Sequence, residues 1–298
     1  MLSFICAVLI FPLHLGLQII NLAFWGTLII GLGLIKLLVP LQPVTKALNV
    51  LLNTGMSGFA LSSVSLINLF NRVEWDYAIE GELKTNRWYL MMSNHLSWLD
   101  IILLMHFAKG RVPATKFFIK RELLWMPFVG LGAWALDMPF MRRYSAEFLA
   151  RNPHLQGKDI ESTRKSCQKF RLLPTTVINF VEGTRYTTEK HQTRKSPYAY
   201  LLHPKAGGVA FTLATMGNLF DGILDVTILY PDNRQHIMLD MLSGRLTCVV
   251  LRARCLPVAQ ELIGDYQGDA RFRDNFQSWL NSLWQQKDSL IKQLLETR

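Results

Sequence analysis

A long apolar run close to the N-terminus restricts the folds open to this chain more than any other feature does. From Leu15 to Ile35 no residue carries a formal charge, and the apolar character extends to Pro40. Because about 20 such residues cross the hydrocarbon core of a bilayer, the run predicts a membrane helix. Lys36 and Lys46 follow it and no charged residue precedes it, so the positive-inside rule predicts a cytoplasmic position for the rest of the chain.

A second apolar stretch, Ala47–Phe70, contains serine and asparagine residues throughout. It fits a second membrane span, a re-entrant partner of the first helix or an interfacial helix, and the three alternatives stay open. We therefore predict one or two membrane-anchoring helices over residues 1–72 and location in a membrane, the bacterial inner membrane, with the following domain facing the cytoplasm. A third apolar stretch, Leu123–Met141, holds Asp137 and two prolines, so we expect it to be protein core or a lipid-contacting floor.

The domain predicted over residues 73–298 alternates between strand-like and helix-like segments past residue 80, which predicts an α/β fold. We expect a central mixed, largely parallel sheet flanked by helices. The C-terminal segment has aromatic and leucine residues at three- and four-residue spacing, so it should form an amphipathic helix that closes the core or contacts the membrane. The predicted strands are Trp88–Ser93, Thr115–Ile119, Met138–Arg142, Thr176–Val181, Val226–Tyr230 and Leu246–Arg254, and the predicted helices are Trp98–Phe107, Ile160–Phe170, Gly207–Met216 and Ala270–Leu295.

The charge balance indicates an anionic partner. The chain has 32 basic and 22 acidic residues, a formal net charge of +10. Some part of its surface should therefore attract membrane headgroups, phosphorylated substrates or nucleic acid.

The stretch "SNHLSWLD", residues 93–100, follows an apolar strand pattern and holds a histidine and an aspartate five residues apart. On a straight helix these side chains would sit roughly 140° apart, so they meet only if His95 lies on a loop and Asp100 in the first turn of the next helix. In one interpretation Ser97 and Asp100 form the capping box of that helix. In the other, Asp100 orients the His95 ring so that its second nitrogen can take a proton from a substrate hydroxyl.

A second motif, Glu182-Gly183-Thr184-Arg185, comes directly after another apolar strand. The glycine frees the backbone and exposes N–H groups, and the arginine offers a planar fork that can hold a phosphate. An ordinary strand-end turn with a surface ion pair between the arginine and the glutamate is the alternative.

Further basic residues occur where elements begin or end. Lys205 precedes a predicted helix start, which is a natural anion site, although a solvated lysine would give the same pattern. Arg142 and Arg143 end another predicted strand and could be an ordinary basic edge.

Taken together, the order of these motifs resembles the glycerophospholipid acyltransferase family, and within it the 1-acylglycerol-3-phosphate acyltransferases. The resemblance runs from about Glu80 to Pro231 and depends on His-x4-Asp preceded by Asn94 and followed at family spacing by "VEGTR". It implies that His95 is the general base and Asp100 its supporting acid.

The resemblance also implies a phosphate site. The family block "GxxFIxR" falls on "DMPFMRR", which makes Arg143 a phosphate ligand, and the block "PEGTR" falls on Val181 to Arg185. The implied phosphate-binding residues are Arg143, Glu182, Gly183, Thr184, Arg185 and Lys205. Asp137 replaces a family glycine beside the expected acyl site, and Val181 replaces a family proline.

The implied function is a membrane-bound transfer of a fatty acyl chain to a lysophospholipid, with lysophosphatidic acid as the expected acceptor and lysocardiolipin or another lysophospholipid as the alternative. Acyl-CoA or acyl-carrier protein is the expected donor, membrane lipids are partners, and no metal, cofactor or nucleic acid is expected. Two other classes remain as alternatives. One is a metal-dependent phosphoesterase with His95 and Asp100 as ligands, and the other is a non-catalytic membrane protein whose basic face binds anionic lipid or nucleic acid.

Overall fold

The computed structural model describes residues 2–141, 170 and 173–297. The predicted helix Ile160–Phe170 therefore lies outside the described residues except for its last position, as do Arg142 and Arg143. The elements in chain order are α1 (Leu2–Leu38), α2 (Gln42–Phe70), β1 (Glu74–Glu80), β2 (Tyr89–Ser93), α3 (Leu99–Ala108), β3 (Thr115–Phe117), β4 (Ile119–Lys120), the 3-10 helix η1 (Arg121–Trp125), α4 (Val129–Ala135), β5 (Phe140–Met141), β6 (Thr176–Phe180), α7 (Thr188–Thr193), α8 (Ala206–Met216), η4 (Gly217–Leu219), β7 (Gly222–Leu229), α9 (Ile237–Leu242), β8 (Cys248–Leu256), η5 (Gln260–Leu262) and α10 (Ala270–Glu296).

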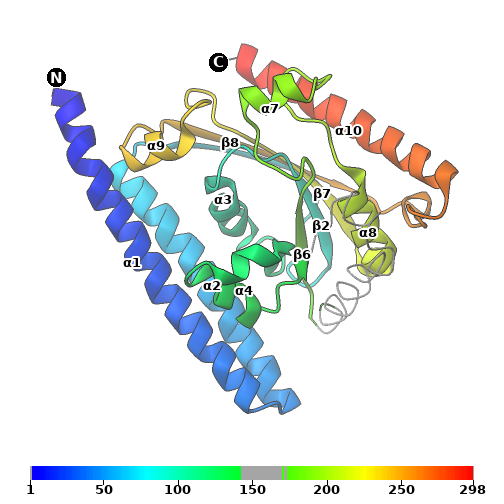
Figure 1. Cartoon of the computed structure of the whole chain (residues 1–298), viewed down its shortest axis with the longest axis horizontal. Helices are drawn as coiled ribbons and strands as arrows, with labels where there is room; N and C mark the ends of the chain where they lie inside the picture. Colours follow the sequence, from blue (N-terminus) through cyan, green and yellow to red (C-terminus); the bar gives the residue numbers. More distant parts are fainter. Residues whose placement is uncertain (1, 142–169, 171–172, 298) are drawn as a thin grey trace.

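The helices α1 and α2 form a long hairpin along one side of the molecule (Figure 1). Both are long and apolar enough to cross a membrane, which agrees with the expectation of one or two such helices. Between them runs a ladder of polar contacts. Ser62 Oγ donates to Asn21 Oδ1 at 2.6 Å, and Asn21 Nδ2 donates to Ser63 Oγ at 2.8 Å. Hydrogen bonds of this kind, with small residues at the crossing, favour helix pairing in an apolar environment.

A six-stranded sheet forms the centre of the α/β part, in the order β1-β8-β7-β2-β6-β3. The neighbouring pairs are parallel except β7 and β8, which are antiparallel. The predicted mixed, largely parallel sheet is confirmed. Because β2 is parallel to both β6 and β7, with Ser93 level with Phe180 and Val226, the loops that leave these three strands begin at one edge of the sheet. Ligands of open α/β sheets bind at such carboxyl edges.

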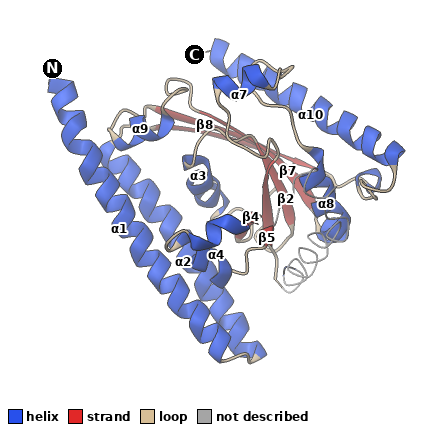
Figure 2. Cartoon of the chain, viewed as in Figure 1, coloured by secondary structure: helices blue, strands red, loops and turns tan. Residues whose placement is uncertain are grey.

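Helices cover both faces of this sheet (Figure 2). Side chains of α2, α3, α4 and α9 pack with one face in a core that includes Leu103, Met91 and Leu224. Side chains of α8 and α10 pack with the other face around Met92 and Trp284. Successive residues of β2 point to opposite faces, so this strand is buried from both sides.

Strand β1 was missed by the sequence analysis. It lies at the sheet edge, and its burial is low at both ends with no alternation. A strand is predicted from alternating apolar residues that form one buried face. The acidic residues Glu74, Asp76 and Glu80 interrupt that pattern, so the sequence did not predict β1. β7 also begins earlier than predicted, at Gly222 rather than Val226.

The third apolar stretch packs against α1. A Cβ at Gly26 would collide with Phe128, and one at Gly33 with Ala135, so α4 lies in close contact with the second half of α1. At the end of this contact Lys36 Nζ lies 2.8 Å from Asp137 Oδ2. The side of the stretch that faces α1 is therefore protein core, which is one of the two expectations for it.

Candidate active site

His95 and Asp100 meet in the turn between β2 and α3. His95 Nδ1 lies 2.8 Å from Asp100 Oδ2, and α3 begins at Leu99. The histidine is on the loop and the aspartate in the first helical turn, which is the arrangement that the five-residue spacing required.

The contacts of this turn fit part of the capping interpretation and also the pairing that the second interpretation requires. The backbone N–H groups of Leu96 and Ser97 donate to Asp100 Oδ2 at 2.6 and 2.8 Å, and Ser97 Oγ accepts from the N–H of Leu99 at 3.2 Å. Asp100 therefore reaches back to the turn in front of α3, as the acidic residue of a capping box does, although the N-cap residue is Trp98 and its side chain forms no capping hydrogen bond. The same oxygen also faces the imidazole, so these backbone contacts fix the carboxylate at the position from which it can hold His95.

The geometry assigns the two ring nitrogens of His95. Because backbone donors already surround Asp100 Oδ2, that oxygen is an acceptor and Nδ1 carries the proton. Nε2 is then the nitrogen that can accept a proton. The ring stacks on Phe180, with centroids 3.9 Å apart and planes at 15°, and its side chain is 11% exposed. This ring is held in place but can be reached.

Tyr230 completes the environment of Asp100 and was not among the predicted site residues. Its hydroxyl donates to Asp100 Oδ1 at 2.6 Å, and both side chains are fully buried. Burial, and next the negative charge of Asp100, raises the pKa of the Tyr230 hydroxyl well above its ordinary value. The sequence signal was the stretch "LDVTILY", residues 224–230, which is similar to the last block of one branch of the glycerophospholipid acyltransferases; that resemblance did not assign a role to the tyrosine.

The loop after β6 lies beside this pair. Gly183 has a φ of 66°, a left-handed conformation that glycine adopts without strain. The N–H of Tyr186 donates to the carbonyl of His95 at 2.7 Å, and the guanidinium of Arg185 lies 4.6 Å from the centre of the Trp98 ring. The structure thus brings the predicted Arg185 to the helix turn that carries the histidine.

Lys190 braces the same loop from α7. Its Nζ donates to Thr184 Oγ1 at 3.1 Å and to the carbonyl of Arg185 at 3.0 Å. The predicted Thr184 is therefore held by a lysine that the sequence analysis did not single out.

Glu182 and Lys205 take different positions. Glu182 is fully buried, and its Oε1 accepts from the N–H of Leu202 at 3.3 Å; burial raises the pKa of this carboxyl to about 8. Lys205 is exposed at the start of α8, and its N–H donates to the carbonyl of Val181 at 2.8 Å. The glutamate faces the interior while the lysine stays at the surface near the same strand end. Arg143 lies outside the described residues.

Asp137 shows how this chain departs from the family glycine. Its φ is 56°, a region where aspartate is tolerated better than most residues. Its carboxylate pairs with Lys36 of α1, so the replacement adds a contact between the hairpin and the α/β part. Within the part of the chain that the structure describes, no three His, Cys, Asp or Glu side chains gather as a metal-binding group.

Comparison with known proteins gives concordant findings. A family profile described as Acyltransferase matches residues 76–230, more than half of the chain. The chain is 25% identical over 278 residues to 1-acyl-sn-glycerol-3-phosphate acyltransferase delta of Homo sapiens, covering 86% of this chain and 67% of that protein. It is 25% identical over 189 residues to the gamma enzyme of Mus musculus, covering 61% of this chain and 46% of that protein.

A solved structure with a similar fold is that of the 1-acyl-sn-glycerophosphate (LPA) acyltransferase PlsC from Thermotoga maritima. It superposes with a TM-score of 0.59 at 16% identity, covering 97% of this chain and 98% of that chain. The fold similarity extends over the N-terminal hairpin as well as the sheet.

Proposed function

The chain belongs to the acyltransferase family, and from this premise we propose that it transfers a fatty acyl chain from acyl-CoA or acyl-carrier protein to the free hydroxyl of a lysophospholipid. The proposed acceptor is 1-acylglycerol-3-phosphate and the product is phosphatidic acid. The names of the delta and gamma relatives support this acceptor. Lysocardiolipin or another lysophospholipid is the second candidate.

One observation carries the proposal: a proton acceptor lies on the turn after β2, and the guanidinium of Arg185, a group that can bind phosphate, lies against that turn from the loop after β6. His95 is paired with Asp100 at 2.8 Å, and Arg185 stacks on Trp98, three residues after the histidine. A lysophospholipid has a free hydroxyl close to a phosphate, so its two polar groups match these two side chains. A planar guanidinium binds phosphate oxygens in pairs.

The proposed chemistry needs one base and two bound substrates. His95 Nε2 takes the proton of the acceptor hydroxyl as the oxygen attacks the thioester carbonyl, and Asp100 stabilises the resulting imidazolium. The tetrahedral intermediate then expels the thiolate, which receives the proton from His95. No acyl-enzyme forms, and much of the rate comes from holding the hydroxyl against the thioester.

For the phosphate we propose Arg185, Lys205 and, from the family resemblance, Arg143 as direct ligands. Gly183 and Thr184 shape the loop. Glu182 is buried and accepts from the N–H of Leu202, so we assign it the role of holding the turn at Leu202 rather than of touching the substrate.

The hairpin supplies the proposed membrane contact. Its outer surface exposes large apolar side chains, including Leu13, Ile20, Phe24 and Leu34 at 50–64%. At one end α1 contacts α9, and Ile10 lies beside Gly244 just after that helix; at the other end α1 contacts α4 through Gly33. Because the α/β part contacts α1 at both ends, we propose that the hairpin lies along one leaflet of the membrane rather than crossing it perpendicularly. The α/β part then faces the cytoplasm.

The experiment is an acylation assay on the purified full-length protein in detergent or vesicles, with a panel of lysophospholipids and both types of acyl donor. We expect acyl transfer to lysophosphatidic acid that survives a chelator and is lost in His95→Ala. Transfer only to lysocardiolipin or another headgroup would correct the acceptor. No transfer to any acceptor would refute the proposal and favour a lipid-binding role, and chelator-sensitive phosphate release would favour the phosphoesterase.

A further inference from the structure

The carboxylate of Asp100 has two oxygens with different partners. Oδ2 accepts from His95 and from two backbone N–H groups of its own turn. Oδ1 accepts from the Tyr230 hydroxyl, 130 residues further along the chain. All contacts to Oδ2 are therefore local, and the contact to Oδ1 is the long-range one.

The sheet sets the position of Tyr230 with little freedom. Asn94 Nδ2 donates to the carbonyl of Ile228 and Asn94 Oδ1 accepts from the N–H of Ile228, both at 2.9 Å. This side chain extends the pairing of β2 with β7 beyond Ser93. Tyr230 follows two residues later on the same side of the pleat as Ile228, which brings its hydroxyl to the first turn of α3.

We propose that Tyr230 is a positioning residue for the acyl transfer: its hydroxyl fixes the plane of the Asp100 carboxylate and withdraws part of its negative charge from His95. This inference rests on the proposed function, in which His95 is the base. Without the hydroxyl, Oδ1 would be a buried acceptor with no partner, and the carboxylate could rotate about the bond that now points Oδ2 at the imidazole.

The direction of the electrostatic effect follows from hydrogen bonding to a charged group. A donor at Oδ1 stabilises the carboxylate and disperses its charge. Removal of the donor leaves more charge to stabilise the imidazolium of His95, so the ring is protonated, and inactive as a base, up to a higher pH. Among the described residues, the other titratable groups that interact with this cluster are Tyr77 of β1, near Tyr230, and Glu182 after β6, near Asp100. The charged guanidinium of Arg185 faces the same turn over Trp98.

The test is Tyr230→Phe in the full-length protein, with Tyr89→Phe as matched control. Tyr89 is equally buried, but its hydroxyl accepts from the N–H of Lys84, at the other end of β2 from the site. We expect Tyr230→Phe to lower kcat about tenfold, as the loss of one hydrogen bond to a charged group would, with the KM of donor and acceptor unchanged. The acid limb of its pH–rate profile should move up by roughly half a unit. Tyr89→Phe should change neither quantity.

Three results would overturn the proposal. One is a normal kcat and acid limb in Tyr230→Phe. Another is a loss of kcat without movement of the acid limb. The third is an equal loss of kcat in Tyr89→Phe, because a merely structural role would lower kcat in both variants alike. If Tyr230→Phe does not fold, wild-type protein grown on 3-fluorotyrosine replaces it. Its more acidic phenol should move the acid limb to lower pH, and an unmoved limb would count against the proposal.

A second readout separates this proposal from the proposed function. In ¹⁵N-histidine-labelled protein in micelles, the His95 ring signal is identified by its absence in His95→Ala. If the wild type transfers no acyl chain, the proposed function fails, yet the titration of this signal still tests the coupling. A midpoint that rises in Tyr230→Phe supports the positioning role, and an unchanged midpoint overturns it.

Discussion

Asp100 and Asp225 are two buried carboxylates on opposite faces of the same sheet, and their partners differ in kind. Asp100 binds neutral donors and one histidine. Asp225, which is level with Met92 of β2, lies 2.7 Å from Lys287 Nζ and 2.9 Å from Arg254 Nε. The first carboxylate faces a group that can gain a proton near neutral pH, whereas the second is neutralised by permanent cations.

The cations around Asp225 are themselves enclosed. Lys287 is 1% exposed and donates to the carbonyl of Val226 at 2.6 Å and to Thr227 Oγ1 at 3.1 Å. Burial lowers the pKa of Lys287, and the nearby Asp225 opposes that shift. This network joins α10 to β7.

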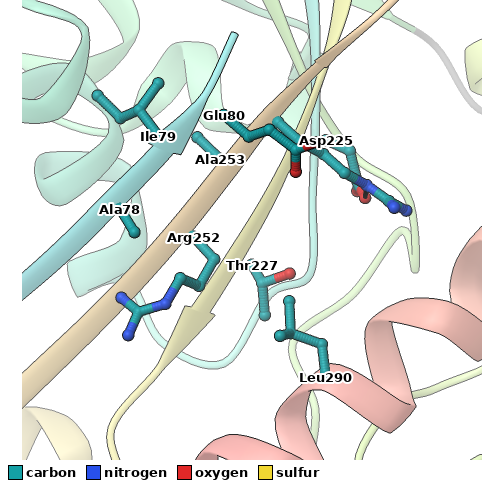
Figure 3. A pocket seen from close by; sticks show the side chains of 9 residues that line it. Ala78, Ile79, Glu80, Asp225, Thr227, Arg252, Ala253 and Leu290 are labelled. Carbon is teal, nitrogen blue, oxygen red and sulfur yellow. Dashed lines mark hydrogen bonds and ion pairs between the residues drawn. The ribbon is translucent and has the colours of Figure 1, made fainter.

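The pocket beside this network has a volume of about 220 Å³ and lies between β1, β7, β8 and α10 (Figure 3). Its arginines are occupied: Arg252 forms a two-pronged pair with Asp76, both contacts at 2.8 Å, and Arg254 binds Asp225. Arg185, in contrast, lies over an aromatic ring beside His95. The two carboxylates therefore differ in their surroundings: the partner of Asp100 can be reached, whereas ion pairs complete the surroundings of Asp225. On the proposed function, we assign a catalytic role to Asp100 and a structural role to Asp225.

The largest expected effect is that of His95→Ala on turnover, which tests the catalytic role proposed for the His95–Asp100 pair. We expect turnover to fall by roughly 10²–10⁴, the usual effect of losing a positioned general base, while circular dichroism and Tm change little. Steady-state acylation rates measure this. Asp100→Asn distinguishes a catalytic role of Asp100 from a purely capping role. A purely capping role predicts a lower Tm with normal turnover, whereas a catalytic role predicts lost turnover in a stable protein. Near-normal turnover in both variants would show that this pair is structural.

Asp225→Asn should affect stability instead. It leaves Lys287 and Arg254 without their carboxylate, and breaking one side of a buried ion pair costs about 3–5 kcal/mol. Denaturant unfolding in micelles measures the loss, and turnover per folded molecule should stay within about twofold. A normal unfolding midpoint together with a large fall in kcat would reverse the two assignments.

Arg185→Lys should change substrate binding. A lysine cannot reproduce the fork of the guanidinium, and a charge-assisted contact is worth about 1.5–3 kcal/mol, so we expect the KM for the lysophospholipid to rise about 10- to 150-fold. The KM for the acyl donor should stay unchanged.

Two controls bear on that result. Arg252→Lys, in the pocket of Figure 3, should leave both KM values unchanged. An acceptor that lacks the phosphate should be acylated slowly and with equal rate by Arg185→Lys and the wild type. Equal losses on both acceptors would mean that Arg185 holds the loop rather than the phosphate.

The smallest expected effect on turnover is that of Glu182→Gln, which should change stability instead. Because burial raises the pKa of Glu182 to about 8, the folded protein holds this proton while the unfolded chain has released it. The wild type should therefore lose stability as pH rises from about 4.5 to about 8. Glutamine keeps the acceptor for Leu202 and removes the titration, so the free energy of unfolding of the variant should rise relative to that of the wild type by about 1.4 kcal/mol for each pH unit in this range, roughly 3–6 °C in Tm per unit. A Tm difference that does not vary with pH would contradict the buried, protonated state.

The predicted elements that the structure confirms are those with strong local patterns. The apolar runs became α1 and α2, and the amphipathic C-terminal segment became α10 almost to the residue. The His-x4-Asp spacing left one possible geometry, a loop histidine and a first-turn aspartate, and the structure has that geometry. These features depend on residues fewer than ten positions apart, so steric and hydrogen-bonding rules along the chain are enough to predict them.

Other features depend on which distant segments pack together, and only the tertiary structure decided them. Tyr230 binds Asp100, and β1 pairs with β8 of the sheet, where Asp76 binds Arg252, 176 residues away. The inward position of Glu182 depends in the same way on the turn at Leu202. No local periodicity marks such partners, because each residue alone is equally suited to solvent or to another neighbour. Their choice follows from strand order and register, which the burial of the whole core determines at once.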